Sequence, residues 1–278
     1  MSVVMALWFR NLKLFVRNRA ALVFNLIFPF FFLFVFGKIF QNDFIENPAT
    51  YMLAGIIIST VFDSSLRMAS STIDDITSGF MKEVIVSPVS RLTIATGQFF
   101  AAATVSAIQG VIIFVAGFFI GLKITTPLTI IYAILLMVFV GLIFAGFGLF
   151  IATVSKNIQT FQAVSLAITM PMTFMSGAYI PISMLPDVLK WVAYFNPMTY
   201  AVSLFRTVTL EKTSLSTEQL VLEELAVKVG SFTVTPMMAF AILAAFGLVF
   251  LVLSTRAFVK IDFSRMNRNK EDSLTEEI

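Results

Sequence analysis

Asp63 and Arg67 are two ionisable residues one helical turn apart in an otherwise apolar stretch. A charged side chain at the centre of a bilayer costs about 2.5 to 3.5 kcal/mol on insertion scales, so it is rarely accidental. At the spacing i, i+4 the two residues can form a buried ion pair. We favour a polar face turned towards a helix interface or a water-filled path, because hydroxyl residues surround the pair: Ser59, Thr60, Ser64 and Ser65. Gln109 lies at a similar depth in a later apolar stretch and can join that face.

The sequence lacks the residues that most covalent, redox and metal chemistry uses. It contains no Cys and no His, which excludes disulfides, zinc fingers and Cys or His nucleophiles. It also has no G-x-x-x-x-G-K-[ST] phosphate loop and no G-x-S-x-G nucleophile elbow. We therefore expect no catalytic residue, no metal site and no cofactor bound by this chain, so that any energy source must lie elsewhere.

The composition is that of a membrane protein. Of the 278 residues 58% are hydrophobic and only 13% are charged, against about 25% charged in soluble domains. Because the apolar runs are continuous rather than alternating, helices are favoured over a β-barrel. We expect a single all-α integral membrane domain over residues 1–278 with six transmembrane helices, at Ala20–Phe40, Tyr51–Ser71, Gln98–Leu122, Leu128–Thr153, Ile158–Met175 and Pro236–Thr255.

The basic residues predict the orientation of these helices. The formal net charge is +3 and the pI is near 9.2, but Lys and Arg lie at the ends of apolar runs and form no single patch, so nucleic acid is not an expected partner. Most of them fall on the side of the N-terminus. By the positive-inside rule both termini are then cytoplasmic. The first apolar run is long and bulky and is expected to be a retained span rather than a cleaved signal.

Two segments on the cytoplasmic side are predicted to lie outside the spans. Residues 4–18 can form a helix in the membrane interface, with Arg10, Lys13 and Arg17 on one side and Trp8, Leu12 and Phe15 roughly opposite. A simple positive flank of the first span is the alternative. The loop of residues 72–91 is expected to hold a short amphipathic helix that ends before Pro88.

Two further segments are predicted on the outer side. In residues 176–210 four breaks interrupt an apolar sequence, which predicts broken helices that dip into the outer leaflet. Residues 213–230 are expected to form a short acidic surface helix that begins with a capping box of Ser216 and Gln219. The polar tail, residues 261–278, is predicted to be cytoplasmic and disordered.

Two motifs resemble a known family. The stretch MKEVIVSPVSR, Met81–Arg91, followed by Gly97, is similar to the segment between the second and third spans of type-2 ATP-binding-cassette exporter permeases. The stretch MSGAYIPISMLPDVLKWVAYFNPMTYAVSLFR, Met175–Arg206, resembles their outer signature, in which Ser176, Gly177, Pro181, Asn196 and Pro197 stand out. The sequence AIQG, Ala107–Gly110, adds a likeness to the daunorubicin-resistance and nodulation-type permeases. The resemblance covers nearly the whole chain.

This resemblance implies partners and roles. Members of the family contain the membrane domain alone, pair as two copies, and work with two copies of a separate cytoplasmic ATPase that holds ATP and Mg, in the cytoplasmic membrane of a prokaryote. The N-terminal helix would be their interfacial elbow. The loop would be the coupling helix that docks into the ATPase, through Gly79, Phe80, Lys82, Glu83 and Val84. One departure is that Asp74 and Asp75 stand where many relatives have a Glu-Arg-rich approach to this loop.

Several functions remain in competition at this stage. The resemblance favours an ATP-driven efflux permease for an amphiphilic drug, antibiotic or lipid-linked compound, working as a homodimer in drug resistance. Export of a polysaccharide or lipid-linked glycan is the alternative within the family. An ion-coupled secondary transporter built around Asp63 would need several midplane ionisable groups and repeat-related broken spans. A passive scaffold would need no coupling loop.

Overall fold

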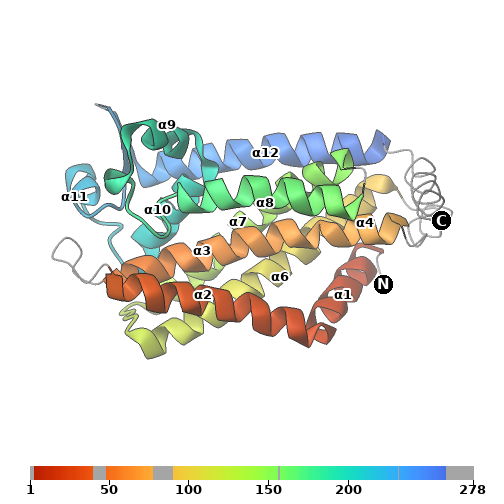
Figure 1. Ribbon diagram of the computed structural model, residues 1–278, viewed down its shortest axis with the longest axis horizontal. Helices are drawn as coiled ribbons and strands as arrows, with labels where there is room; N and C mark the ends of the chain where they lie inside the picture. The colour runs from red at the N-terminus through yellow and green to blue at the C-terminus, as the bar shows by residue number, and fades with distance from the viewer. Residues whose placement is uncertain (1–2, 40–47, 78–89, 156, 231, 261–278) are drawn as a thin grey trace.

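Long helices dominate the computed structural model, which describes residues 3–39, 48–77, 90–155, 157–230 and 232–260 (Figure 1). The long helices are α1 (Val3–Arg17), α2 (Arg19–Ile39), α3 (Pro48–Met68), α6 (Arg91–Ile120), α7 (Pro127–Val154), α8 (Ile158–Phe174) and α12 (Pro236–Lys260). Apart from the oblique α1, they run side by side along the longest axis of the molecule, and α1 begins at the end where α12 finishes. The short helix α4 (Ser70–Thr77) follows α3 at that same end, which we call the α4 end.

Four segments of the described residues are long and apolar enough to cross a membrane: Thr50–Asp75, Arg91–Phe119, Pro127–Val154 and Pro236–Val259. This agrees with the expected all-α, multi-pass membrane protein. The other two predicted spans correspond to α2, whose apolar segment Val23–Phe32 is shorter, and to α8, which has 17 residues. Both lie alongside α3 in the bundle (Figure 1). Six spans therefore stay a prediction.

Helix α3 lies at the centre of the core. Every side chain from Tyr51 to Phe62 is buried, and α3 packs against α6, α7, α2 and α10. The rings of Phe62 and Phe144 meet edge to face with centroids 4.5 Å apart. A Cβ on Gly141 would lie 2.4 Å from Ser106 Oγ and 3.1 Å from Ala103 Cα, so glycine is required where α6 and α7 approach. The small residues of α7 thus serve helix packing within the chain.

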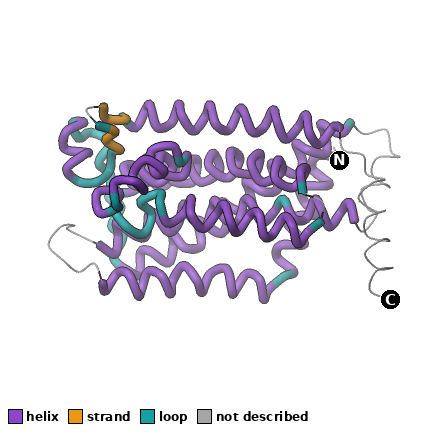
Figure 2. Tube along the Cα trace, turned by 45° about the horizontal axis from the view of Figure 1, so that its top comes forward, coloured by secondary structure: helices purple, strands orange, loops and turns teal. Residues whose placement is uncertain are grey.

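The opposite end carries shorter elements and is called the α9 end (Figures 1 and 2). They are the 3-10 turn η1 (Ile182–Met184), α9 (Asp187–Phe195), α10 (Pro197–Thr209), α11 (Thr217–Leu222) and the strands β1 (Val227–Val229) and β2 (Phe232–Val234). The capping box of Ser216 and Gln219 is confirmed. The predicted helix over residues 213–230 is wrong beyond Leu222. There β-branched residues alternate, so that Val227 and Val234 pair and are buried while Lys228 is exposed.

Helix α1 packs on α6 by a different face from the expected one. The buried side chains of α1 are Leu7 and Asn11, whereas Trp8, Leu12 and Phe15 are only half-buried. Asn11 is buried because its Nδ2 donates to Gln98 Oε1 at 2.9 Å. Because α1 ends at Arg17 and α2 begins at Arg19, one residue joins them, and its amide still donates to the carbonyls of Leu14 and Phe15.

A polar network ties α1 to α4 and α6. Arg10 donates two hydrogen bonds to the buried Asp75, from Nη1 to Oδ2 at 2.8 Å and from Nη2 to Oδ1 at 2.5 Å. Gln98 Nε2 also donates to Asp75 Oδ2 at 3.5 Å. The hydrogen bonds to Asp75 raise the pKa of the Arg10 guanidinium. This bidentate pair fixes α4 at the point where the chain enters residues 78–89.

A second carboxylate holds the start of α7. Glu211, just after α10, accepts hydrogen bonds from the backbone amides of Thr125 at 3.1 Å and Thr126 at 2.7 Å, and from Thr129 Oγ1 at 2.9 Å. The hydroxyl of Thr125 donates to it as well. Hydrogen bonds to its charged form lower the pKa of Glu211 to about 2. The charge also complements the positive end of the helix dipole.

Asp75→Asn should lower the stability of the bundle in detergent micelles. Asparagine cannot accept both bonds from Arg10 as an anion, and the loss of charge-assisted hydrogen bonds from a buried site costs about 1 to 3 kcal/mol. Thermal unfolding of the purified chain measures this. Asp74→Asn is the matched control, since Asp74 is exposed. Equal midpoints for the two variants would contradict the role given to Asp75.

The stability supplied by Glu211 should depend on pH. A folded-state pKa of about 2, below the ordinary 4.5, means that the contribution is fully present above pH 4.5 and is lost as the pH falls towards 2. The melting temperature of Glu211→Gln should therefore lie below that of the wild type at neutral pH, and the gap should close between pH 4.5 and 2. Glu218→Gln controls for the change in net charge. A gap that widens in acid would overturn the assignment.

Candidate functional site

A cavity of about 460 Å³ lies between α2, α3 and α8. Asp63 and Arg67 of α3 both line it, so the structure brings these two predicted residues into one site. Further polar side chains come from all three helices: Asn25, Ser59, Thr60, Thr169 and Thr173. The hydroxyl Oγ1 of Thr173 is buried without a hydrogen-bond partner, so it can bond a molecule held in the cavity.

Asp63 and Arg67 do not form an ion pair. No nitrogen of Arg67 lies within 4.0 Å of an Asp63 carboxylate oxygen among the ion pairs of the described residues, although i, i+4 spacing permits contact. Asp63 is half-buried and Arg67 is exposed. The two side chains therefore make no direct contact, although Arg67 attracts the Asp63 carboxylate and both line the cavity. The polar face that we favoured from the sequence stays a prediction.

Part of the wall of the cavity is aromatic. The ring of Phe32 lies 5.1 Å from that of Tyr179 and 6.1 Å from that of Phe174, measured between centroids. The rings of Phe28 and Phe32 are tilted by 44° with centroids 5.6 Å apart. A cavity lined by both charged and aromatic side chains suits an amphiphilic molecule.

Sequence reasoning missed some residues of this site and included one residue, Gln109, that does not line it. Asn25 is the only amide in the predicted first span and could have been found by the same argument as Asp63. Tyr179 enters the cavity because the chain folds back after α8, which no local pattern predicts. Gln109 is buried in α6 and does not line the cavity, so the structure does not bring it together with Asp63.

The predicted outer motif is the set of side chains that makes the broken helices possible. Ser176 Oγ donates to the carbonyl of Thr173 at 2.7 Å and accepts the amide of Ala178 at 3.3 Å. Gly177 has φ of +82°, a left-handed conformation that favours glycine. Pro181 directly precedes η1. These contacts satisfy backbone groups that the interruption of the helix leaves free.

The Asn-Pro pair of the same motif begins α10. Asn196 Oδ1 accepts the amide of Met198 at 3.0 Å as an N-cap, and its Nδ2 donates to the carbonyl of Met172 at 2.6 Å. Pro197 occupies the first helical position, where its missing N–H costs nothing. The pair therefore starts α10 and ties it to the last turn of α8.

The remaining predicted residues lie at the α4 end. In α1, Trp8 Nε1 donates to Thr104 Oγ1 at 3.0 Å, Arg10 is held by Asp75, and Lys13 and Arg17 are exposed. The predicted coupling residues lie outside the described residues: Gly79, Phe80, Lys82, Glu83 and Val84. Helix α4 leads directly into that segment.

Comparison with known proteins places the chain in a family. The family described as ABC-2 type transporter matches residues 2–210. A putative transport permease ycf38 of Porphyra purpurea is 30% identical over 198 residues, which cover 67% of this chain and 66% of that protein. The ycf38 protein of Cyanophora paradoxa is 26% identical over 68% of each chain.

A second group of relatives carries another name. Nodulation protein J of Rhizobium leguminosarum bv. viciae is 24% identical over 220 residues, or 74% of this chain and 82% of that protein. The region that matches the family, residues 2–210, includes the cavity residues of α2, α3 and α8 and the motif that begins α10. Since the family match spans most of the chain, this protein belongs to the ABC-2 type transporter family.

Proposed function

We propose that this chain is the permease subunit of an ATP-driven exporter that moves an amphiphilic molecule outward across the cytoplasmic membrane. The family match over residues 2–210 carries this proposal. ATP and Mg are bound by a separate ATPase, and the loop of residues 72–91 is the coupling segment that docks into it. Two permease copies and two ATPase copies make the working unit, and both termini are cytoplasmic. In this arrangement α2 and α8 are the first and fifth of six spans.

The cavity between α2, α3 and α8, which we call the central cavity, favours an amphiphilic cargo such as a drug, antibiotic or lipid-linked compound. Asp63, Arg67 and the surrounding hydroxyls offer bonds to a polar head, while the aromatic wall receives an apolar body. The rim is open and apolar, since Phe24 and Phe28 of α2 and Leu166 and Met170 of α8 are all more than half exposed. A second copy of the chain packed along α2 and α8 would cover such a rim.

Export of a polysaccharide or lipid-linked glycan is the second candidate. The cluster of Phe28, Phe32, Phe174 and Tyr179 favours it, because aromatic faces stack on sugar rings and suit a channel for a glycan. An ion-coupled mechanism has less support. Asp63 is the one carboxylate among the lining residues of this cavity, whereas ion-coupled carriers usually use several ionisable groups.

The proposed function predicts a physical complex with an ATPase. The tagged chain should co-purify with the ATPase encoded beside it, and ATP turnover in lipid bilayers should respond to cargo. Phe80→Asp should reduce association or stimulated turnover about tenfold, since it places a charge on an apolar docking side chain. Phe232→Asp is the matched control, because Phe232 is an exposed phenylalanine at the α9 end. Failure to associate with any ATPase would favour the ion-coupled alternative.

The role of Asp63 is tested separately. Asp63→Asn should insert and bind the ATPase normally but transport about tenfold more slowly, because the cargo loses a charge-assisted hydrogen bond. Transport into inside-out vesicles measures this, with Glu218→Gln on the exposed helix α11 as the control. Transport at the wild-type rate would show that the cavity charge plays no part.

A further inference from the structure

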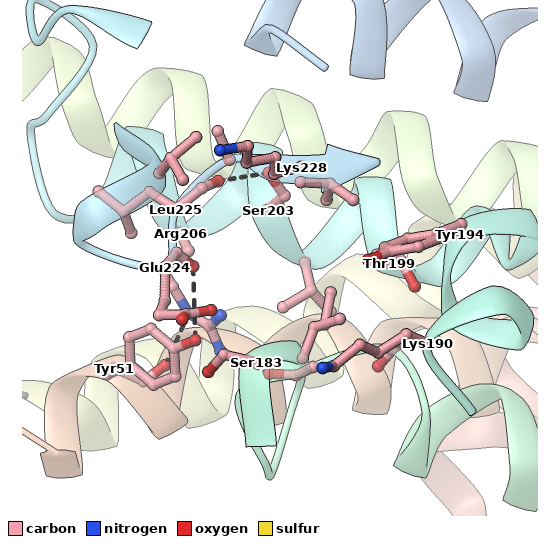
Figure 3. A pocket seen from close by; sticks show the side chains of 17 residues that line it. Tyr51, Ser183, Lys190, Tyr194, Thr199, Ser203, Arg206, Glu224, Leu225 and Lys228 are labelled. Atoms are coloured by element: carbon pink, nitrogen blue, oxygen red, sulfur yellow. Dashed lines mark hydrogen bonds between the residues drawn. The ribbon is translucent and has the colours of Figure 1, made fainter. Parts of the chain in front are cut away.

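A second cavity lies at the α9 end, far from α4, and none of its features is used by the transport path proposed above. Its volume is about 250 Å³, and it is enclosed by the start of α3, by α9 and α10, and by the segment around β1 (Figure 3). Three cations line it, namely Lys190, Arg206 and Lys228, against the single carboxylate of Glu224. The formal charge of the lining is therefore about +2 at neutral pH.

Arg206 is the buried member of this set. Its side chain is only 2% exposed, and Nε donates to the carbonyl of Tyr51 at 3.1 Å while Nη2 donates to the carbonyl of Gly177 at 3.0 Å. The guanidinium carbon lies 3.4 Å from the centroid of the Tyr51 ring. Nη1 donates to no residue that the structure describes, and no described carboxylate lies within 4.0 Å of the guanidinium. The carboxylate of Glu224 lines the same cavity and attracts the guanidinium without contacting it, so a further anion that accepts from Nη1 would stabilise the buried charge.

The other cations reach the same cavity from different elements. Lys190 comes from α9 and Lys228 from β1, and Figure 3 shows both at the same cavity as Arg206 and Glu224, which lie next to Tyr51. Lys190 also pairs with the exposed Asp187 at 2.9 Å, which leaves its other protons available. The phenol of Tyr51 donates to the carbonyl of Glu224 at 3.4 Å and so closes one side.

We propose that this cavity binds a phosphate monoester group, supplied either by soluble phosphate or a soluble phosphate monoester or by a lipid whose headgroup ends in a phosphate monoester, such as phosphatidic acid. A phosphate monoester carries about −1.5 to −2 charge at neutral pH and three strong acceptor oxygens, which match a net charge of about +2 and donors arriving from three elements. The planar fork of Arg206 suits phosphate oxygens better than a single acceptor. A singly charged carboxylate would leave part of the lining charge unpaired. The site stands independently of the transport function, since it uses none of the residues of the central cavity.

Binding can be measured on the full chain in nanodiscs without any ATPase. The chain has two tryptophans, and Trp191 of α9 lies edge to face with Tyr194, which lines the cavity, at 5.8 Å between centroids. Trp8 lies at the α4 end and supplies a constant background. In phosphatidylcholine nanodiscs, added inorganic phosphate should change the Trp191 fluorescence saturably, and calorimetry should give the same dissociation constant. Acetate at equal ionic strength should produce a much weaker response.

Charge variants decide whether this is the site. Lys228→Gln and Lys190→Gln should each weaken phosphate binding about tenfold, since each removes a charge-assisted contact. Lys123→Gln, on an exposed lysine outside the cavity, should bind as the wild type does. Arg206→Gln should abolish binding, but Arg206 also supports the fold, so the lysine variants carry the test. A phosphate dissociation constant unchanged in both lysine variants, an equal response to acetate, or no saturable response would overturn the proposal.

The source of the phosphate follows from a second set of nanodiscs. If phosphatidic acid in the bilayer raises the apparent dissociation constant for inorganic phosphate more than an equal amount of phosphatidylglycerol does, a lipid phosphate monoester competes for the cavity and is the natural occupant. If phosphatidic acid has no more effect than phosphatidylglycerol while phosphate still binds, the occupant is soluble phosphate or a soluble phosphate monoester. Both results support an anion site, and the absence of phosphate binding in either bilayer contradicts it.

Discussion

The hydrogen bonds that Arg206 donates to the carbonyls of Tyr51 and Gly177 hold together the end of the bundle where the chain stops being helical. A backbone group buried away from water needs a partner, so a break in a buried helix must be satisfied by the protein itself. Arg206 does this for the carbonyl of Gly177 in its left-handed turn and ties that turn to the first turn of α3. Ser176 and Asn196 do the same for the carbonyls of Thr173 and Met172. The fold of the α9 end depends on these side chains.

The centre and the α4 end follow different rules. Around α3 the packing is apolar and close, and glycine is needed where a neighbour approaches, as at Gly55, where a Cβ would lie 2.3 Å from the carbonyl oxygen of Ala178. At the α4 end a polar network of Arg10, Asp75, Gln98 and Asn11 fixes the helices. Helix α3 connects all three regions, with Tyr51 at one end, Asp63 in the central cavity and α4 directly after its other end.

The sequence predicted the features that depend on local composition. Continuous apolar runs predicted α6, α7 and α12, and the residue types of Ser216 and Gln219 predicted a helix start that the structure confirms. Features set by distant contacts could not be predicted. The buried face of α1 is determined by the hydrogen bond between Asn11 and Gln98, 87 residues away. The hairpin at Val227 is determined by packing against α10 rather than by helix propensity.

For the site, the sequence identified Asp63 and Arg67 but not their surroundings. Depth along a helix can be counted from the sequence, whereas the side that a residue faces depends on its neighbours. Gln109 has a similar depth to Asp63 but lies outside the cavity, and Tyr179 lines the cavity although it follows the end of α8. Arg206 appeared in the sequence only as the last residue of a motif, and its burial became visible only with α3 and Gly177 in place.

The junction of α1 and α2 has a mechanical consequence. A single residue, Asn18, separates the two helices, and its amide continues the hydrogen bonding of α1. A link this short keeps the end of α1 and the start of α2 together. Helix α1 is held by Arg10 to Asp75 of α4, and α2 is one wall of the central cavity. The position of α1 is therefore coupled through the chain to the wall of that cavity.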